Sequence, residues 1–580
     1  MAEKKTKVRH KRDFENMDDK KTLDVILSDY TASKGFQADY FDKFREFYQL
    51  YRSYLTTHRE TGSNLFIPYT FHIIETVTPK IVNAMFYTRP YVQTVPLGVD
   101  DSVREEKSKK MNKLLDYQFM QKMAIVPKCT DTIKTALMYG TAITKQTWDY
   151  EKKEVIKRQP STILGIELPI LKEVLVEEIV KDQPKMTLIP ILDFFFDPSG
   201  TTIEDCRYCI HRYSEDIDEL KRQAAKSGGA YKNLDKLEED SSGGAGESDF
   251  LSSIGVGGGT NRSKEVEILE YWTDDWVVKV ANQSVVIMST ENPYYHKKKP
   301  FAKWVDTPVP NEFYGIGEIE PIVHLQHELN TTRNQRIDNA SFALNRMWKK
   351  MRGANIDPNQ LVSRPNGVIE VDDMTDLEEL EVHQVTVGYE EEQIIKNDID
   401  RTTGVYDSAR GSNPARRETA TTMSILSNAS SERFQIKVLL LSEGGFKDAV
   451  RQIIQLNQQY IDHNTELMIL GTDGTMEVGE IQPSDILGEY DILAVGSAIA
   501  PSLNKEVKQN QLIQLLNVVN QNPLVNQEEF LRRLFEAFEM RNIDALIINP
   551  EEMPMEGMPI EQLGMMGPGL PEEGGTMDGY

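Results

Sequence analysis

Residues 316–348 restrict the possible folds of this chain more than any other stretch. After Gly317 they contain no glycine, and their one proline, Pro321, falls in the first turns, so they predict a helix roughly 50 Å long. Yet residues 326–336, in the middle of that helix, are almost wholly polar. A helix that is polar all round is not stabilised by packing into the core of one subunit. We therefore expect it to lie against copies of itself or to bridge solvent, and the first arrangement predicts an oligomer.

Charge and cysteine content exclude several classes of protein. Acidic residues outnumber basic ones by 91 to 66, which gives a net charge of −25, whereas a protein that coats nucleic acid needs a basic surface. Three cysteines in 580 residues cannot form a disulfide framework, which predicts a reducing compartment. Residues 1–12 are charged and precede no apolar signal segment, and no run approaches 18 apolar residues. These features predict a soluble cytoplasmic protein.

Apolar periodicity predicts an α+β fold that is predominantly helical. Residues 22–55 repeat aromatic side chains at the spacing of one buried helix face, and residues 129–147 predict a helix that passes through Tyr139-Gly140-Thr141 into a strand. Further helices are expected at 68–86, 103–122, 389–403, 419–460, 504–520 and 526–545, and strands at 153–192, 265–272, 276–288, 490–495 and within 351–387.

Two stretches differ in composition from the rest of the chain. Residues 226–263 hold 9 Gly and 7 Ser, which predicts a solvated, mobile insertion. Residues 551–580 hold 7 acidic residues, 7 Gly and no Lys or Arg, which predicts a disordered acidic tail.

The sequence carries no strong signal for catalysis or for a cofactor. It contains no Gly-Lys dipeptide, which excludes a P-loop, and Gly315-Ile316-Gly317 has Glu320 where a dinucleotide fingerprint needs its third glycine. These glycines are better explained as a tight turn from a strand into a helix. We predict no enzymatic activity and no cofactor.

Two groups of residues are weak candidates for metal binding. Cys206 and Cys209 form a single CxxC with His211 nearby, but structural zinc needs four ligands, so buried thiols are the favoured interpretation. His324 and His327 lie three residues apart without an HExxH pattern, which favours surface histidines. We predict no metal site.

Each cluster of charged residues can be interpreted either as solvent-exposed surface or as a site that acts on a polyanion. The acidic residues of 389–403 either form a solvated helix face or line a passage for a polyanion, which like charge would keep from sticking: Glu390, Glu391, Glu392, Asp398 and Asp400. The arginines of a breaker-rich loop either aid solubility or make transient phosphate contacts: Arg410, Arg416 and Arg417. The basic start of the chain, residues 4–12, is either a disordered tail or a contact with an anion or a partner.

Several motifs, taken in order, resemble one known family. They are Phe66-Ile67-Pro68-Tyr69 with the following residues 79–83 and Arg89-Pro90, Ala136-Leu137-Met138-Tyr139-Gly140-Thr141, Phe195-Phe196-Asp197-Pro198 followed by 209–213, and Thr419-Ala420-Thr421 leading to Arg433-Phe434. The strongest is Tyr314-Gly315-Ile316-Gly317 running into residues 330–345. Together they resemble the portal proteins of tailed bacteriophages, in particular of short-tailed phages. These proteins form the ring at one capsid vertex through which DNA is packaged and ejected.

The resemblance implies a portal fold of wing, stem, clip and crown that assembles as a dodecameric ring around a central channel. It places a basic N-terminal tail at 1–21, the wing at 22–315 with the insertion 226–263, and a first stem helix at 316–348. The remaining parts would be the clip at 349–388, a second stem helix at 389–404, a tunnel loop at 405–423, further wing elements at 424–503, the crown at 504–550 and the acidic tail at 551–580.

The resemblance also implies roles for individual residues. The tunnel loop would contact DNA through Arg410, Arg416 and Arg417, and the acidic residues of 389–403 would face the channel. Polar contacts of the stem between subunits would come from Glu328, Arg333, Asn334, Gln335, Arg336 and Asp338. Docking of partners at the clip would use Lys349, Lys350, Arg352 and Arg364.

The partners implied are further copies of the chain, the major capsid protein, the large subunit of the terminase, a tail or adaptor protein, and double-stranded DNA bound without sequence preference. No membrane is implied, and the expected location is the virion. The alternative is a different head–tail connector or adaptor ring that does not dock a terminase.

Overall fold

The computed structural model describes most of the first 494 residues and little beyond them. The described residues are 14–15, 17–55, 59–60, 62–87, 89–96, 102–163, 166–227, 229–239, 265–345, 347–353, 355–361, 368–371, 373–380, 388–405, 432–462, 465–470, 476–494, 515, 530–532 and 534–535. The chain divides into two compact units, Met1–Ile469 with Val478–Pro501, and Leu470–Glu477 with Ser502–Tyr580. Everything below concerns the first unit, which is of the α+β class.

Four helices dominate the N-terminal part, as the apolar periodicity predicted: α1 (Asp19–Tyr51), α2 (Tyr69–Phe86), α3 (Ser102–Tyr117), which continues as a π-helix (Gln118–Lys122), and α4 (Ile125–Tyr139). The aromatic stripe of α1 supplies Phe44 and Phe47 to the main core, and α2 adds Ile73, Ile74 and Val77, all fully or nearly fully buried. Gly140 then ends α4 with φ +81, so the predicted step from helix to strand is confirmed.

A three-stranded antiparallel sheet has the order β3-β2-β9. It comprises β2 (Thr141–Ile163), β3 (Ile166–Ile189) and β9 (Phe301–Val305). The two long strands pair with each other along almost their whole length, so the strands expected within 153–192 belong to one extended hairpin. Because β9 pairs only with residues 141–145 of β2, the outer part of the hairpin is a two-stranded ribbon.

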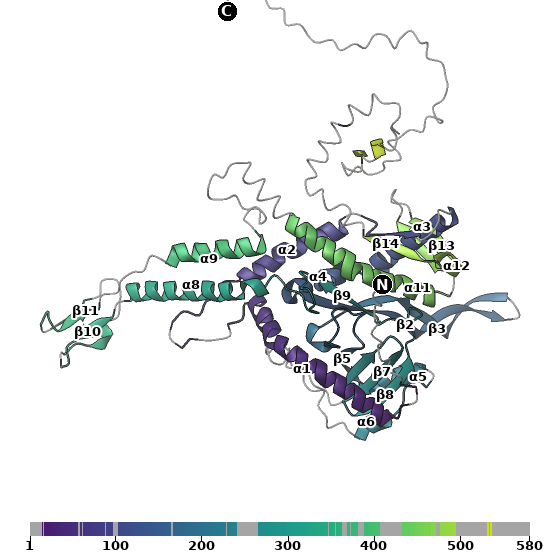
Figure 1. Ribbon diagram of the computed structural model, residues 1–580, viewed down its shortest axis with the longest axis horizontal. Helices are drawn as coiled ribbons and strands as arrows, with labels where there is room; N and C mark the ends of the chain where they lie inside the picture. The colour runs from purple at the N-terminus through teal and green to yellow at the C-terminus, as the bar shows by residue number, and fades with distance from the viewer. Residues whose placement is uncertain are drawn as a thin grey trace, which may run out of the picture. The chain divides into compact units, whose positions relative to one another are not determined.

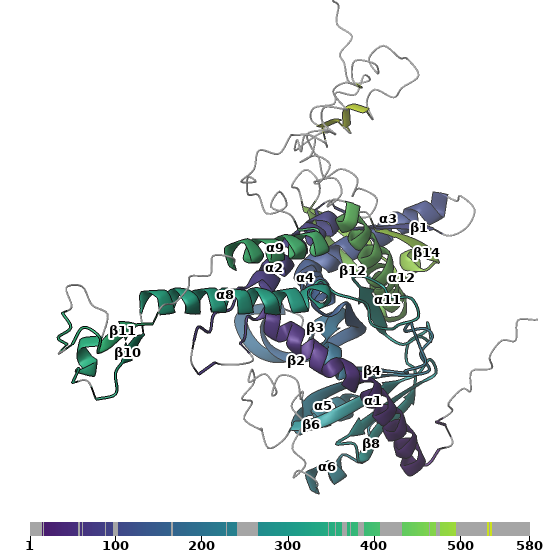
Figure 2. The ribbon, with the colours of Figure 1, turned by 60° about the vertical axis from the view of Figure 1, so that its left-hand side comes forward.

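The second sheet has five antiparallel strands in sequential order. They are β4 (Phe194–Phe196), β5 (Cys209–Asp216), β6 (Glu265–Trp272), β7 (Trp276–Ala281) and β8 (Val285–Glu291). The single strand expected at 276–288 is wrong, because Asn282 and Gln283 take positive φ and form a hairpin turn there. Helix α1 lies along this sheet (Figures 1 and 2), where its Ile26 and Tyr30 pack on Phe195.

The insertion expected at 226–263 is partly ordered. Helix α5 (Ile217–Lys226) leads to α6 (Asp235–Glu239), whose Leu237 is buried against the second sheet. The backbone N–H of Lys232 donates to the carbonyl of Ile287, which fixes this part of the segment to β8. Residues 240–263 lie outside the described part of the chain, as do residues 1–13 of the expected N-terminal tail and residues 551–580 of the expected acidic tail.

The paired helices expected for the stem are present with different bounds. A 3₁₀ turn (Glu320–Ile322) precedes α8 (Val323–Leu344), and α9 (Gly388–Thr403) lies beside it, with the short antiparallel pair β10 (Trp348–Lys350) and β11 (Leu377–Glu379) at their far end (Figure 1). The expected helix at 316–348 is therefore too long, since residues 316–319 are not part of a helix and the backbone of Gly315, Gly317 and Glu318 contacts the end of α4. A second 3₁₀ turn (Pro358–Leu361) follows β10, and the turn expected at 365–367 lies outside the described residues.

The C-terminal part of the unit returns to the main core. Helical residues 432–441 continue through a π-helix (Ser442–Phe446) into α11 (Lys447–Tyr460), which confirms the second half of the helix expected at 419–460. The remaining elements are β12 (Thr465–Leu470), β13 (Met476–Ile481), α12 (Pro483–Ile486) and β14 (Tyr490–Ala494), and β14 pairs with β1 (Val92–Pro96). None of the helices in the described ranges is both long and apolar enough to cross a lipid bilayer.

Candidate functional site at the paired helices

One face of α8 carries four polar side chains spaced four residues apart: Gln326, Asn330, Asn334 and Asp338. Each accepts a hydrogen bond from a backbone N–H in residues 63–70: Thr70 to Gln326 (3.2 Å), Ile67 to Asn330 (3.0 Å), Leu65 to Asn334 (2.8 Å) and Ser63 to Asp338 (2.5 Å). Gln326 and Asn334 also donate to the carbonyls of Ile67 and Leu65, each at 2.9 Å. We call this set the polar ladder of α8.

The ladder works because two backbone repeats match. Four residues of an α-helix rise about 6.0 Å, and two residues of extended chain advance roughly 6.6 Å. Every second N–H from Ser63 to Ile67 therefore meets every fourth side chain from Asp338 back to Asn330, and these side chains take the place of a neighbouring strand. Thr70, three residues after Ile67 and in the first turn of α2, meets Gln326. Gln326 is fully buried, and Asn330 and Asn334 are nearly so. The expectation that this polar helix could be sheltered only by copies of itself or by solvent is thus wrong for this face.

A buried carboxylate joins α8 to α9. The side chain of Glu392 is 6% exposed and lies between three cations: Arg333 at 2.6 Å, Lys396 at 3.1 Å and Arg336 at 3.3 Å. The guanidinium of Arg336 also lies over the ring of Tyr389, 4.1 Å from its centroid. Because a buried charge is tolerated only when it is paired, this cluster fixes the two helices in one relative position.

The structure changes the roles expected of the acidic residues in α9. Glu392 is enclosed by its three cations, and buried Asp400 accepts a hydrogen bond of 2.6 Å from the hydroxyl of Tyr69. Neither can face a passing polyanion, so both assignments are corrected. Glu390 and Glu391 are exposed, and Asp398 is about half exposed.

Of the six polar residues expected to bridge subunits along the stem, four have partners within the chain and two are exposed. Arg333 and Arg336 bind Glu392, Asn334 binds the backbone of Leu65, and Asp338 binds Ser63 and Arg59, all within one chain. Each of these groups therefore has a partner within the chain, and their role as contacts between subunits stays a prediction. Glu328 and Gln335 are exposed on α8.

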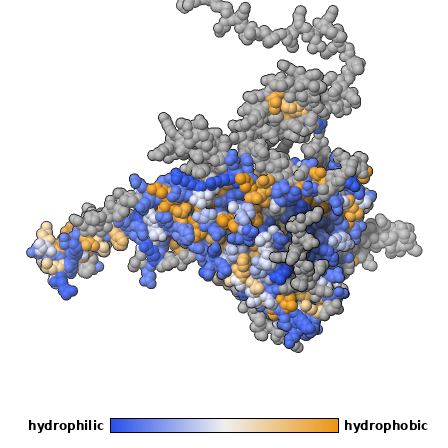
Figure 3. Space-filling view, in the orientation of Figure 1, coloured by the Kyte–Doolittle hydropathy of each residue, from blue (hydrophilic) through white to orange (hydrophobic). Residues whose placement is uncertain are grey.

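The far end of the paired helices carries exposed apolar side chains beside charged ones, as Figure 3 shows around β10 and β11. Met351, Val368 and Met374 are 59%, 70% and 87% exposed. The predicted docking residues Lys349, Lys350 and Arg352 are exposed here as well, although Lys349 contacts Glu378 at 3.5 Å and Lys350 donates to the carbonyl of Ile356 at 3.0 Å. Arg364 lies outside the described residues, and so do Arg410, Arg416 and Arg417 of the expected tunnel loop and nearly all of the expected crown.

The C-terminal end of α9 is held by the helix that begins near residue 432. Arg433 donates to the carbonyls of Arg401 (3.2 Å) and Thr402 (3.4 Å), which would otherwise lack partners at the helix end. One turn further on, Lys437 contacts both oxygens of Asp306 at 2.8 and 2.7 Å and Glu318 at 2.8 Å. The side chain of Asp306 is fully buried and that of Glu318 is 6% exposed. Burial raises the pKa of Asp306 to about 7, although Lys437 acts in the opposite direction.

Three glycines allow the backbone to approach closely next to this cluster. A Cβ atom on Gly140 would lie 1.9 Å from the carbonyl oxygen of Gly315, and one on Gly317 would lie 2.5 Å from that of Leu137. The neighbouring backbone is bonded across the same contact, because Glu318 donates to Leu137 at 2.7 Å. The glycines of the Tyr314-Gly315-Ile316-Gly317 motif therefore serve close packing against α4, where we had expected a tight turn into a helix.

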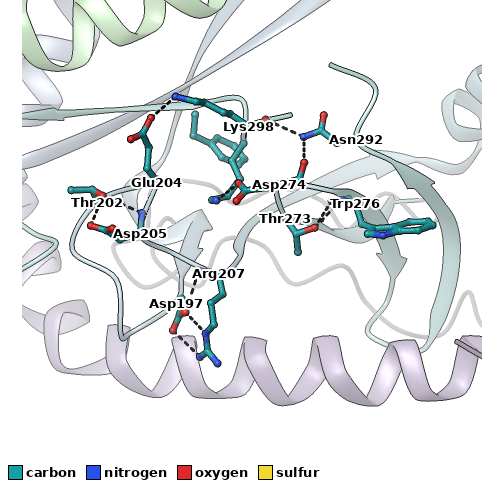
Figure 4. Close-up of polar contacts among 12 residues, drawn as sticks. Asp197, Thr202, Glu204, Asp205, Arg207, Thr273, Asp274, Trp276, Asn292 and Lys298 are labelled. Carbon is teal, nitrogen blue, oxygen red and sulfur yellow. Dashed lines mark hydrogen bonds and ion pairs between the residues drawn. The ribbon is translucent and has the colours of Figure 1, made fainter. Parts of the chain in front are cut away.

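The Phe195-Phe196-Asp197-Pro198 motif ends in a polar cluster of loop residues beside the second sheet (Figure 4). Arg207 holds Asp197 through its side chain at 2.5 and 3.1 Å, and Ser199 donates to the same carboxylate. Burial opposes ionisation of this carboxylate, but the hydrogen bonds from Arg207 and Ser199 lower the pKa of Asp197 to about 2. Glu204 reaches Lys298 at 2.6 Å on the other side of the loop. The cluster fixes loops and presents no reactive group.

The cysteines and histidines considered as metal ligands are either buried as free thiols or in contact with a glutamate. Cys206 and Cys209 are buried free thiols, and burial raises the pKa of the Cys209 thiol. His211 lies 3.6 Å from buried Glu270, and His327 contacts Glu46 at 2.8 Å. Among the residues that the structure describes, no three His, Cys, Asp or Glu side chains converge as metal ligands.

Sequence reasoning missed Gln326 and Asn330 of the ladder and the cluster of Asp306, Glu318 and Lys437. The four-residue spacing of polar side chains from Gln326 to Asp338 was a usable signal for the ladder. No comparable signal marks the second cluster, because its members are far apart in the sequence.

The sequence was also compared with known protein families and with curated proteins. A family model described as phage SU10 portal protein matches residues 22–174 and 166–567, which together span most of the chain. No curated protein matches the chain.

Proposed function

Because the chain belongs to the phage SU10 portal protein family, we propose that it forms a dodecameric ring at one vertex of the capsid of a short-tailed phage. The terminase motor drives DNA through the central channel during packaging, and the DNA leaves by the same route at ejection. The ring assembles in the host cytoplasm and becomes part of the virion. Its partners are the major capsid protein, the terminase large subunit, a tail or adaptor protein and the DNA itself.

The observation that carries this proposal is the attachment of α8 to α9 through buried Glu392, together with the family match over residues 22–567. Two helices joined in this way, with β10 and β11 at their far end, suit a stem that bears the clip. In this assignment residues 349–388 are the clip, 405–423 the tunnel loop, 504–550 the crown, and the two sheets with α1 to α4 belong to the wing.

Electrostatics suit a channel through which DNA slides. Twelve chains of net charge −25 would together carry roughly −300, and acidic walls repel a phosphate backbone from every side. Exposed Glu390 and Glu391, with half-exposed Asp398, are the residues of α9 available for this repulsion. Arg410, Arg416 and Arg417 would add weak, repeated phosphate contacts that steady the DNA without holding it.

The clip is the proposed docking surface for the terminase and later for the adaptor. Its exposed Met351, Val368 and Met374 form the apolar kind of surface that marks protein–protein contacts. Lys349, Lys350, Arg352 and Arg364 supply charge beside it. The chain itself has no phosphate cradle of the P-loop type, so we propose no catalytic activity and assign ATP hydrolysis to the separate motor.

The first experiment is electron microscopy of the purified chain in negative stain. We expect annular particles in views along the axis, and a monomer at all concentrations would refute the proposal. Co-sedimentation with the terminase large subunit separates a portal from the alternative adaptor ring, which would not bind the motor. Robust ATP turnover by the pure chain would contradict a passive conduit.

The second experiment replaces the three arginines of the proposed tunnel loop with alanine, R410A/R416A/R417A. Rings should form normally, while the amount of packaged or retained DNA should fall at least tenfold because phosphate contacts are lost. The matched control, R45A/R222A/R451A, removes three arginines from surface ion pairs of the i, i+3 kind, which contribute little. Loss of ring assembly in the first variant would show that its arginines are structural.

A further inference from the structure

The described chain on the two sides of residues 406–431 is held at one joint. On the N-terminal side, Gly404 turns the chain with φ +73 at the end of α9, and Val405 is fully buried. On the C-terminal side, Arg433 binds the carbonyls of Arg401 and Thr402, and its side chain passes 3.3 Å from where a Cβ on Gly404 would lie. Both ends of the segment are therefore fastened next to each other.

Lys437 connects this joint to the wing and to the start of α8. It lies one helical turn after Arg433, so the same helix face carries both residues. Asp306 directly follows β9, and its N–H donates to the carbonyl of Gly140, whereas Glu318 lies two residues before the 3₁₀ turn that precedes α8. One ammonium group thus ties together three elements that are distant in the sequence.

The ionic contacts of Lys437 restrict the position of its helix along the helix axis more strictly than apolar packing does. The helix already packs on the core through Phe434, Val438 and Leu441, which are all buried. Apolar contacts tolerate small shifts along a helix axis, but charge-assisted hydrogen bonds of 2.7 to 2.8 Å depend on distance and direction. The cluster therefore sets the position of the helix along its axis.

We propose that Lys437 is a positioning residue, which through Asp306 and Glu318 fixes the joint at the base of residues 406–431 to the wing. The proposal rests on the function proposed above, in which that segment contains the tunnel loop. Force that DNA exerts on the segment would then pass into the core of the wing, and the helix of residues 432–441 would not slide. Arg433 holds α9 to the same joint, so that the stem and the wing keep one relative position.

The test compares four variants in the full chain. K437M leaves two buried carboxylates without their cation and is expected to damage folding, so the decisive variant is D306N/E318Q/K437M, which removes all three charges at similar volume. K437R keeps a cation that can reach both carboxylates. K447M is the matched control, because Lys447 lies on the same continuous helix but contacts the more exposed Glu443 and Asp491 at 3.2 and 3.7 Å.

Two measurements decide the outcome. We expect the triple variant to form rings, to exchange the amides of residues 432–441 at least tenfold faster, and to package or retain at least tenfold less DNA. K437R and K447M should stay within about twofold of the natural chain in both measurements. Normal packaging by the triple variant would overturn the proposal, even if amide exchange in residues 432–441 increases. Unchanged amide exchange in these residues would also overturn it. If the natural chain itself forms no rings, the proposed function fails, while exchange in the free chain still tests the joint.

Discussion

Two asparagines of the polar ladder offer a test in which the same substitution has consequences of different size. Asn330 and Asn334 lie one turn apart on α8 and are 8% and 7% exposed. The Oδ1 atom of Asn330 accepts both recorded hydrogen bonds of that side chain, from the N–H of Ile67 and from the amide of Gln326. Asn334 accepts from the N–H of Leu65 and also donates to its carbonyl. Replacement of each by aspartate keeps the acceptor and removes the donor.

The expected difference follows from that one donor. Both variants bear the cost of a nearly buried carboxylate, which cancels in the comparison. N334D additionally loses a hydrogen bond, about 1 kcal/mol net, and leaves the carbonyl of Leu65 facing a carboxylate oxygen, which costs roughly another 1–3 kcal/mol. Asp338 one turn further adds a few tenths of a kcal/mol of like-charge repulsion. We therefore expect N334D to weaken the ladder by about 2 kcal/mol or more relative to N330D.

Hydrogen exchange measured by mass spectrometry on peptides from residues 62–70 reads this difference directly. Local opening should be at least roughly 30-fold more frequent in N334D than in N330D, since each 1.4 kcal/mol is a factor of ten. T331A, on the exposed side of the same helix, is the control and should leave exchange in this segment unchanged. Equal exchange in N330D and N334D would show that the side-chain donor of Asn334 does not hold the segment, and would refute the ladder as described.

Three further outcomes are expected. G140A should prevent folding of the first unit, because φ +81 disfavours a side chain and the new Cβ would overlap the carbonyl of Gly315; soluble yield measures this, and normal yield would contradict it. E392A should destabilise the chain by about 3–5 kcal/mol, since three cations lose their partner, whereas E390A on the exposed face should change the thermal midpoint little. The contribution of Asp306 to stability should decline with rising pH, because its pKa of about 7 in the folded chain exceeds the ordinary value of 3.8. The contribution is therefore complete below about pH 4 and lost as the pH passes 7. The difference in thermal midpoint between the natural chain and D306N should accordingly shrink or reverse between pH 5 and 8, and a difference independent of pH would refute this.

The elements that local sequence determines were predicted well. The aromatic spacing of residues 22–55 corresponds to α1, and the acidic helix expected at 389–403 corresponds to α9 within one residue. Tyr139-Gly140-Thr141 marks the step from α4 to β2 because only glycine accepts the positive φ at that point without cost. In each case the signal lies within a few residues of the structure it specifies.

The partners of buried polar groups were not predictable in the same way. The surroundings of Glu392 depend on Arg333 and Arg336, which come close to it because the chain returns alongside α8 after β11. A run of three glutamates gives no indication that the third is buried, because helical periodicity fixes the direction of a side chain but not what lies there. The polar middle of α8 was misjudged for the same reason, since its shelter is a segment more than 250 residues earlier in the chain.

These corrections also change how the charge of a channel should be counted. Screening limits electrostatic effects to about 8 Å at physiological ionic strength, so charges farther than this from a passing phosphate add little to the force on it. Within α9, Glu392 is neutralised by three cations and Asp400 is buried against Tyr69, which leaves Glu390, Glu391 and Asp398 to act on a passing phosphate. If α9 lines the channel, the repulsion that lets DNA slide therefore comes from a few exposed residues repeated around the ring, and the net charge of the chain is a poor measure of it.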